Sequence, residues 1–523
     1  MDEDWLRLLT PEQLQMVSGR LLRELKETRD QLNQSSSNSS KPPSTRAPWA
    51  ANPNRAAPSS PSSTQKNTPA APTSNVESAP ASAPGDSTSA PAGGASGTSD
   101  KPSGGKKAGK QPGAKGIGRM QKLAVTDTEE HFPDCCAVCG QSLTREGAQA
   151  YTGWDEIDIA EKATGQIGLS LQVTRHRLYA VSCACGHVTR AAHHVAPDDQ
   201  LWDGVELGEW RLVGPRLAGA IVFLSLRMRL SRARIREFFI ELFDLQLSTG
   251  VLDETIREAG RALAPLEDGM VRDIEEAALL HADETPWKEA GKPLWLWVFA
   301  AAYTTLFFIG SRSLEILSNV LTSAFKGQLM SDGYLAYRHL GNRLRCWAHL
   351  LRKVQGLTES TDARVVRAGK AMQDVLCTLM EAIYLARATP GHENGALASQ
   401  YAVQIACLRT LCEQHKGDSH GKLRSLAVEF LLDWDVILRQ VSEPHLPLTN
   451  NAAEQALRHW VIARRISYGT RSEAGTRAFA LLASVIETCR KRAASSWAYI
   501  ATVIAAARKG VALPALPPIP SGT

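Results

Sequence analysis

The 523-residue sequence contains a long stretch with almost no large apolar side chains. From Gln34 to Gly118 it consists mostly of Ser, Pro, Ala, Gly and Thr. A segment of this composition cannot bury enough apolar surface to offset the entropy lost when its backbone becomes ordered. We therefore expect residues 34–122 to form a disordered linker, and the folded parts of the chain to lie on either side of it.

The sequence also lacks a secretory signal and a clear membrane span. Its first residues, Met-Asp-Glu-Asp-Trp, are acidic and are not followed by an apolar core, which predicts a cytoplasmic protein. Residues 293–311 carry no charge, but their aromatic and β-branched content, interrupted by Tyr303-Thr304-Thr305, favours two short buried strands. In a reducing compartment the ten cysteines need no disulfide partners and remain free for packing or for a metal.

Positive charge is modest in total and uneven in distribution. The net charge is +5, but residues 101–122, at the end of the linker, are basic and contain no acidic residue. Residues 227–236 contain five arginines. A basic run of this kind is either a solvated surface or a segment that contacts phosphates.

Residues 1–33 are expected to contain a helix over 11–33, with a proline in its first turn. Its leucines follow a partial heptad, which permits a coiled coil and thus self-association. These leucines are Leu14, Leu21, Leu25 and Leu32.

A second helical region is predicted over residues 207–276. Ser231 and Ser248 can each cap a helix, and the turn at 244–247 separates the two helices. These are the dimensions of a helix-turn-helix unit, although such pairs are also common in all-α packing. DNA contact and simple packing both remain open for this unit.

Two cysteine pairs lie between residues 123 and 195. They are Cys136-x2-Cys139 and Cys183-x-Cys185, and each precedes a glycine, as a tight turn that directs thiolates at one metal requires. Zinc is the natural ion for four thiolates. Cys135 or His187 could replace one ligand, and a cysteine-bearing hairpin packed without metal is the alternative.

Strand-like sequence begins near residue 278. The segment 278–287 reads as a buried strand that ends at Asp283 and is stopped by Pro286. The elements expected after it are strands at 294–300 and 305–310, a helix at 313–325, a strand that ends at Asp332, and a strand at 344–347. This order is that of the ribonuclease-H-like fold, in which the first and fourth strands lie side by side.

The two aspartates would therefore meet and require a cation. A third acid, Glu454, is expected in the first turns of a helix that Asn450 caps, after a helical insertion over about 350–445. Oxygen ligands favour magnesium over zinc. The sequence thus predicts an α/β protein with a ribonuclease-H-like core over 277–480, preceded by the zinc-finger-like β segment and the helical region, and followed by a helical tail over 481–523.

The chain resembles transposases of the bacterial insertion-sequence sixty-six family over nearly its whole length. The stretches that carry the resemblance are Asn38-Ser-Ser-Lys-Pro-Pro43, the Gly-Lys-Gln-Pro-Gly run ending at Gly113, His281-Ala-Asp-Glu-Thr-Pro-Trp287, Ser331-Asp-Gly-Tyr334, Cys346-Trp-Ala-His349, Asn450-Asn-Ala-Ala-Glu454 and Ser484-Val-Ile-Glu-Thr488. The resemblance implies that Asp283, Asp332 and Glu454 are the catalytic triad and that Cys136 and Cys139 belong to a zinc-finger-like segment. The Cys183-x-Cys185 spacing departs from the family, which more often has two intervening residues.

The expected activity is metal-dependent cleavage and joining of DNA at the ends of an insertion sequence, with two magnesium ions held by the three carboxylates. Candidate phosphate contacts are Arg458, Arg464, Arg465 and Arg471, for which a solvated helix face is the alternative. The expected partners are transposon-end and target DNA, a second copy of the chain, and small accessory proteins. Two rival interpretations are a non-catalytic DNA-binding relic and a nuclease that cuts without joining.

Overall fold

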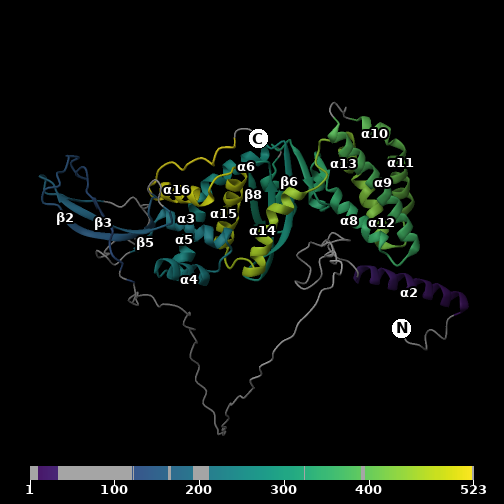
Figure 1. Ribbon diagram of the computed structural model, residues 1–523, viewed down its shortest axis with the longest axis horizontal. Helices are drawn as coiled ribbons and strands as arrows, with labels where there is room; N and C mark the ends of the chain where they lie inside the picture. Colours follow the sequence, from purple (N-terminus) through teal and green to yellow (C-terminus); the bar gives the residue numbers. More distant parts are fainter. Residues whose placement is uncertain are drawn as a thin grey trace, which may run out of the picture. The chain divides into compact units, whose positions relative to one another are not determined.

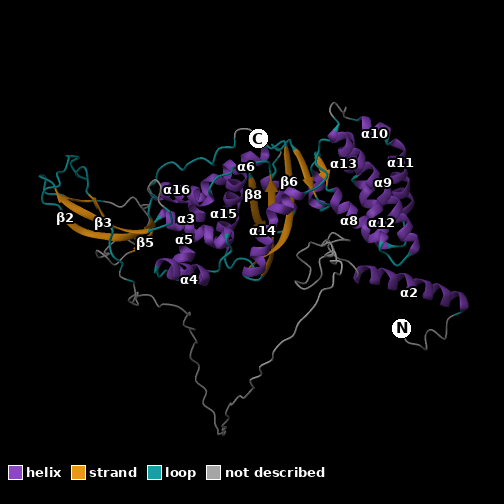
Figure 2. Ribbon diagram, viewed as in Figure 1, coloured by secondary structure: helices purple, strands orange, loops and turns teal. Residues whose placement is uncertain are grey.

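The computed structural model describes residues 10–32, 121, 123–162, 167–191, 211–322, 324–389 and 395–520. Figure 1 labels the elements along the chain, and Figure 2 separates helices from strands. Almost all of the predicted linker, residues 34–122, lies outside the described residues. The predicted N-terminal helix is present as α2, Pro11–Leu32.

The first sheet contains the two cysteine pairs in the loops that adjoin it. Its strands run in the order β1-β3-β2-β5, with β4 paired to β3. They are β1 (Asp127–His131), β2 (Gln149–Ile159), β3 (Leu171–Ser182), β4 (Val188–Arg190) and β5 (Arg211–Val213). Strands β2 and β3 form a long antiparallel pair, whereas β1 runs parallel to β3.

From Pro215 the chain is helical, as the sequence predicts. The predicted helical region also included residues 211–213, which instead form β5, because their backbone pairs with Asp155–Ile157 of β2. The helical elements are α3 (Pro215–Val222), the π-helix η3 (Phe223–Arg227), α4 (Arg232–Phe243), α5 (Thr249–Leu263), the 3-10 helix η4 (Ala264–Leu266) and α6 (Glu267–Glu275). Ser231 caps α4 by accepting from the Arg234 N–H, and Ser248 caps α5 by accepting from the Val251 N–H. The two capped helices and their turn therefore lie where the sequence predicts a helix-turn-helix-like unit.

The second sheet has the order β10-β9-β6-β7-β8. Its elements are β6 (Leu279–Glu289), β7 (Lys292–Ala300), β8 (Thr305–Gly310), α7 (Leu314–Val320), β9 (Gln328–Ser331), the 3-10 helix η5 (Leu335–His339) and β10 (Arg343–Arg345). Strands β6, β7 and β8 are antiparallel, while β9 is parallel to both β6 and β10. The first and fourth strands of this region are thus neighbours, as predicted.

Strand β6 differs from the expectation in one respect. It does not end near Asp283 but continues to Glu289, with Pro286 paired to Trp295 of β7. The proline is tolerated because β9 pairs with β6 only over Leu279–His281, so the segment around residue 286 has no ladder partner on that side.

The uncharged segment 293–311 forms β7 and β8, which pair with each other as two buried strands. In the described part of the chain, no helix combines the length and the apolar character that crossing a membrane requires.

Between β10 and the helix that carries Glu454, in the range predicted to be a helical insertion, residues 346–389 and 395–450 contain six helices. They are α8 (Trp347–Thr358), α9 (Ala363–Ala388), α10 (Ala396–Gln400), α11 (Ala402–His415), α12 (Gly421–Leu432) and α13 (Trp434–Ser442). Their apolar side chains form a core of their own, which includes Leu350, Leu376 and Phe430.

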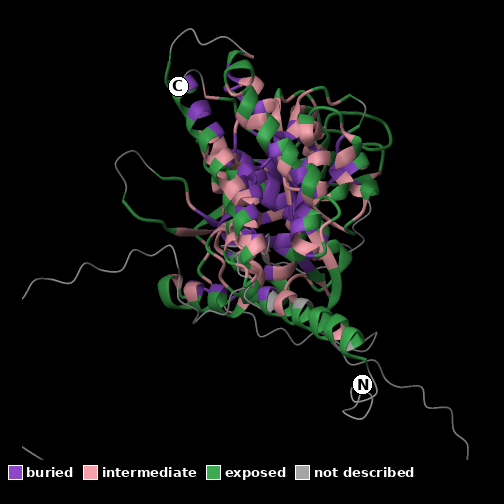
Figure 3. Cartoon of the chain, turned by 90° about the vertical axis from the view of Figure 1, so that its right-hand side faces the viewer, coloured by how far each residue is buried: buried purple, intermediate pink, exposed green. Residues whose placement is uncertain are grey.

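Helices α14 (Asn451–Ser467), α15 (Glu473–Lys491) and α16 (Ser496–Arg508) pack on the second sheet and on the helical region. Helices α14 and α15 pack against the second sheet, and α16 packs against α3 and α5. Trp460 of α14 contacts both Phe307 of β8 and Phe479 of α15 edge-on. The buried residues of this shared core appear in purple in Figure 3.

Candidate functional site

The register of the second sheet brings the two predicted aspartates together. The last parallel pair between β6 and β9 is His281 opposite Met330. Asp283 and Asp332 each follow that pair by two residues, on neighbouring strands that run in the same direction. Side chains two residues apart on a strand share a face. The two carboxylates therefore project from matching positions at the point where the strands separate.

Electrostatics agrees with this proximity. Burial raises the pKa of Asp283 well above its ordinary value, and the negative charges of Asp332, Glu284 and Glu454 raise it further. Carboxylates gathered in this way repel each other unless a proton or a cation compensates their charge. The site is therefore suited to a hard divalent cation with oxygen ligands.

Glu454 lies in the first turn of α14, as predicted, and its carboxylate turns toward α8. Its Oε1 lies 3.4 Å from Arg352 Nη2 and 3.8 Å from His349 Nδ1. Its donor atom converges within 4.8 Å with those of His349 and Cys346, a set that contains neither aspartate. The Cys346-x2-His349 motif thus adjoins the carboxylate of α14.

Asn450 connects the helix of Glu454 to the strand of Asp283. Its fully buried side chain donates to the Ala282 carbonyl oxygen at 2.8 Å, and its Oδ1 lies 3.1 Å from His281 Nδ1. Its backbone N–H contacts Cys346 Sγ at 3.3 Å. Asn450 precedes α14 as expected, but its side chain makes no capping bond to the helix. This cross-link, and the part of His281 in it, were not evident from the sequence.

Replacing Asn450 with Ala is expected to lower the free energy of unfolding by about 1–3 kcal/mol, because it leaves buried polar groups of β6 without partners. Thermal unfolding of the full chain measures this effect. Asn451→Ala is the matched control, since Asn451 is the next residue and is exposed. Equal melting temperatures for the two variants would contradict the role of Asn450 as a cross-link.

A second polar network holds Glu284, the residue after Asp283. Glu284 Oε2 accepts a hydrogen bond from Tyr337 at 2.9 Å, and its Oε1 pairs with Arg312 at 2.6 Å. The Arg312 guanidinium also stacks over Tyr334, whose backbone N–H donates to Asp332 Oδ1 at 2.8 Å. The network therefore links the loops that follow β8 and β9 to the strand of Asp283.

Burial raises the pKa of Glu284 to about 7, and the negative charge of Asp332 adds to this effect, whereas Arg312 opposes it. Glu284 thus lies in the electrostatic field of the aspartates without being a member of the predicted triad. In the sequence, only the position of Glu284 next to Asp283 in the strand indicates that it belongs to the site. That position does not distinguish an acid with a structural role from a metal ligand.

A buried ionic network between β10 and the helical insertion lies beside Gly333, the residue that follows Asp332. The guanidinium of Arg345, on β10, is fully buried and pairs with Glu429 and Asp433 of the helical insertion. A Cβ on Gly333 would lie 2.6 Å from Arg345 Nη2 and 2.7 Å from Glu429 Oε1, so a side chain after Asp332 would displace this ion pair. The network also contains Arg343, 3.1 Å from Asp433, and Lys353, 2.7 Å from Glu429.

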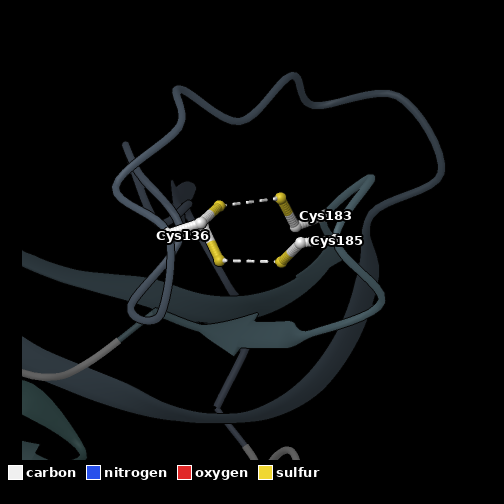
Figure 4. Close-up of side chains that lie close together, drawn as sticks. Cys136, Cys183 and Cys185 are labelled. Atoms are coloured by element: carbon white, nitrogen blue, oxygen red, sulfur yellow. Dashed lines mark hydrogen bonds between the residues drawn. The ribbon is translucent and has the colours of Figure 1, made fainter.

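The four predicted cysteines come together in one cluster. Cys136 Sγ lies 3.7 Å from Cys185 Sγ, and Cys139 Sγ lies 3.6 Å from Cys183 Sγ (Figure 4). All four sulfurs lie within 4.8 Å of one another. The glycines after the pairs, Gly140 and Gly186, have φ of 69° and 85°, a left-handed conformation that glycine adopts without strain.

The thiols of this cluster differ in acidity. The backbone N–H of Cys139 lowers the pKa of Cys136 to about 6, and that of Val138 adds to the effect. The Gln141 N–H favours the Cys139 thiolate, but hydrogen bonds with the neighbouring thiols outweigh it and raise the pKa of Cys139 to about 12. The Cys136 thiolate is therefore favoured, whereas the Cys139 thiolate is disfavoured unless a cation is present. Four sulfur donors of this kind fit zinc.

The four arginines considered for DNA binding have different environments. Arg458, Arg465 and Arg471 are exposed. Arg464 is half-buried and donates to Thr285 Oγ1 at 3.0 Å and to the Pro286 carbonyl oxygen. Arg464 therefore secures the end of α14 to β6 in this structure.

Comparison with known proteins identifies relatives in Sinorhizobium fredii. The chain is 24% identical to uncharacterized protein y4qI over 283 residues, which cover 47% of this chain and 51% of y4qI. It is 29% identical to uncharacterized protein y4jO over 172 residues, covering 33% of this chain and 50% of y4jO. It is 24% identical to uncharacterized protein y4hP over 413 residues, covering 71% and 70% of the two chains. The chain thus spans about half the length of the first two relatives.

The family model described as "Transposase IS66 family" matches residues 211–478, just over half of the 523-residue chain. The match begins at β5 and ends within α15, so it contains Asp283, Asp332, Glu454 and the whole helical insertion. The chain therefore belongs to the IS66 family of transposases.

Proposed function

We propose that this protein is a DNA transposase that cuts DNA at the ends of an insertion sequence and joins those ends to target DNA. The observation that carries the proposal is the β6–β9 register, which gives Asp283 and Asp332 matching positions beside a helix that carries Glu454. The strand order β10-β9-β6-β7-β8 supports a ribonuclease-H-like core. Membership of a transposase family supplies DNA as the substrate class.

Asp283, Asp332 and Glu454 are the proposed ligands of magnesium, and the raised pKa of Asp283 agrees with a site that requires a cation. Bound magnesium would activate the attacking oxygen and stabilise the charge on the leaving oxygen. The chain's own contribution is placement. Asn450 ties the helix of Glu454 to β6, and the Tyr334 N–H orients Asp332.

DNA binding is assigned to two basic surfaces. Arg458, Arg465 and Arg471 are exposed on or beside α14, the helix that carries Glu454. The capped helices α4 and α5 form the second surface, with arginines at positions 232, 234 and 236. Contacts to phosphates from such side chains position the DNA without reading its sequence.

We also propose that the protein acts as a homo-oligomer in the cytoplasm, with accessory proteins of the same element as further partners. Exposed apolar side chains on α2 support self-association. They are Met16, Leu21, Leu22 and Leu25.

The function is tested by incubating the full-length protein with magnesium, labelled DNA that carries the element's ends, and a target plasmid. A transposase yields both cut ends and products in which an end is joined to the plasmid. Cutting without joining would establish a nuclease instead, and binding without cutting would establish a DNA-binding relic.

We further propose that the four-cysteine cluster binds zinc. The double variant Cys136→Ser/Cys139→Ser is then expected to lose about one equivalent of zinc relative to the unchanged protein, because both ligands of one pair are removed. Elemental analysis of protein purified without chelators measures the loss. Cys135→Ser is the control, since Cys135 is exposed and lies outside the cluster. Equal zinc contents in the double variant and the control would refute the site.

A further inference from the structure

A group of potential metal ligands lies on one face of the first sheet, apart from the four cysteines. Strand β1 runs parallel to β3, with Glu129 directly opposite His176. His131 is two residues further along β1 and therefore projects from the same face as Glu129. The antiparallel neighbour of His176 on its other side is Trp154 of β2. The sheet register thus brings two imidazoles and one carboxylate together.

The donor atoms of these side chains converge. His131 Nε2 lies 3.0 Å from His176 Nδ1, and Glu129 Oε2 lies 3.4 Å from the same Nδ1. All three donor atoms lie within 4.8 Å of one another. Around a tetrahedral zinc with bonds of about 2.0–2.2 Å, neighbouring donor atoms are about 3.3–3.6 Å apart. The three side chains therefore need only small movements to share one ion.

The central ligand is held rigidly. His176 is 9% exposed, and its ring stacks on Trp154 with centroids 4.6 Å apart and an interplanar angle of 11°. Its Nε2 has no hydrogen-bond partner, so Nδ1 makes all of the ring's polar contacts. When the neutral imidazoles carry their protons on His176 Nε2 and His131 Nδ1, the two facing ring nitrogens and the ionised carboxylate all direct lone pairs at one another. A shared proton relieves one such contact, whereas a cation relieves all of them.

We propose that Glu129, His131 and His176 form a second transition-metal site, with two nitrogen ligands and one oxygen ligand. This donor set suits zinc. The site goes beyond the proposed transposase chemistry and is distinct from the four-cysteine cluster. Because three protein ligands leave a coordination position open and the Glu129 side chain is 61% exposed, the fourth ligand is water or an anionic oxygen from solution.

Titration of the full-length protein, freed of transition metals, with cobalt(II), used as a spectroscopic substitute for zinc, tests the proposal. Excess magnesium is present throughout to occupy the proposed site at Asp283, Asp332 and Glu454. The unchanged protein should bind about two equivalents, of which only the one at the four cysteines gives thiolate-to-cobalt charge transfer. His176→Gln should bind one equivalent and retain this band. Cys136→Ser/Cys139→Ser should bind one equivalent and lack it.

Glu129→Gln provides a milder variant should His176→Gln fail to fold. It should weaken binding of the second equivalent by at least about tenfold while the charge-transfer band is retained. Glu130→Gln is the matched control, because Glu130 follows Glu129 on β1, is exposed and contacts Tyr179 instead. A single equivalent in the unchanged protein, or unaltered second binding in Glu129→Gln, would overturn the proposal.

Discussion

Asp283→Asn, Asp332→Asn and Glu454→Gln are each expected to abolish DNA cleavage and joining while DNA-end binding persists. Each change removes one proposed magnesium ligand and preserves the shape of the side chain. Loss of a ligand at a two-metal site removes the stabilisation of both attacking and leaving oxygens, so product should fall below detection. Gel assays of cleavage and of end binding, made with the same preparations, measure the two effects separately.

Stability measurements separate loss of chemistry from loss of folding. The folded protein raises the pKa of Asp283 above its unfolded value, so the ionised carboxylate opposes folding at all pH values above the unfolded pKa of about 3.9. Without metal, Asp283→Asn should therefore melt no lower than the unchanged protein at neutral pH. Magnesium should raise the melting temperature of the unchanged protein more than that of the variant.

Exposed acids in equivalent positions serve as controls for the triad. Glu473 lies in the first turn of α15, as Glu454 does in α14, and Asp268 lies in the first turn of α6. Glu473→Gln and Asp268→Asn should retain full cleavage. Normal cleavage by any of the three triad variants would show that the assignment of the catalytic acids is wrong.

Asp433→Asn is expected to destabilise the protein by about 3–5 kcal/mol, because it removes the charge partner of a guanidinium that is fully out of contact with water. Asp433 is 1% exposed and faces Arg345, Arg343 and Arg338. Two of these arginines lie on β10, the strand beside β9. The change should therefore also destabilise the β9–β10 pair that precedes Asp332. Thermal unfolding and limited proteolysis of the helical insertion measure the effect.

The ionic network also predicts a pH dependence. Burial opposes ionisation of Asp433, but Arg345 and Arg343 outweigh it and hold its pKa below the ordinary value. A carboxylate of this kind stabilises the fold above the unfolded pKa of about 3.9, and this contribution is lost as pH falls through the folded pKa. Asp435→Asn is the control, since Asp435 is exposed in the first turn of α13, two residues after Asp433. Similar acid unfolding of the two variants would contradict this account.

The elements that carry the proposed site could be predicted because local sequence specifies them. The aromatic and β-branched residues of 293–311, interrupted by Tyr303-Thr304-Thr305, mark two strands that the structure contains as β7 and β8. Ser231 and Ser248 mark helix starts that the structure confirms. The neighbouring positions of β6 and β9 followed from the order of the elements. The matching positions of Asp283 and Asp332 depend only on that pairing and on their distance from its last residue pair.

Contacts between distant segments could not be predicted in the same way. Arg464 was considered for DNA binding, yet its guanidinium bonds to the end of β6, because the arrangement of α14 on the sheet is not visible in local patterns. Asn450 was expected to cap its own helix but bonds to Ala282 instead. The end of β6 was placed too early, since a proline stops a strand only where its missing N–H would be needed.

The helical insertion also affects what can happen during synthesis of the chain. Asp283 and Asp332 emerge from the ribosome well before Glu454. Residues 346–449 lie between the last strand, β10, and Asn450, which ties α14 to the sheet. A polypeptide that terminates early, anywhere in that interval, contains both aspartates but lacks the third acid and the asparagine that holds its helix. Such a product would carry α4 and α5 without a complete set of acids. Under the proposed function, a nascent chain therefore cannot cut DNA until translation has passed the insertion.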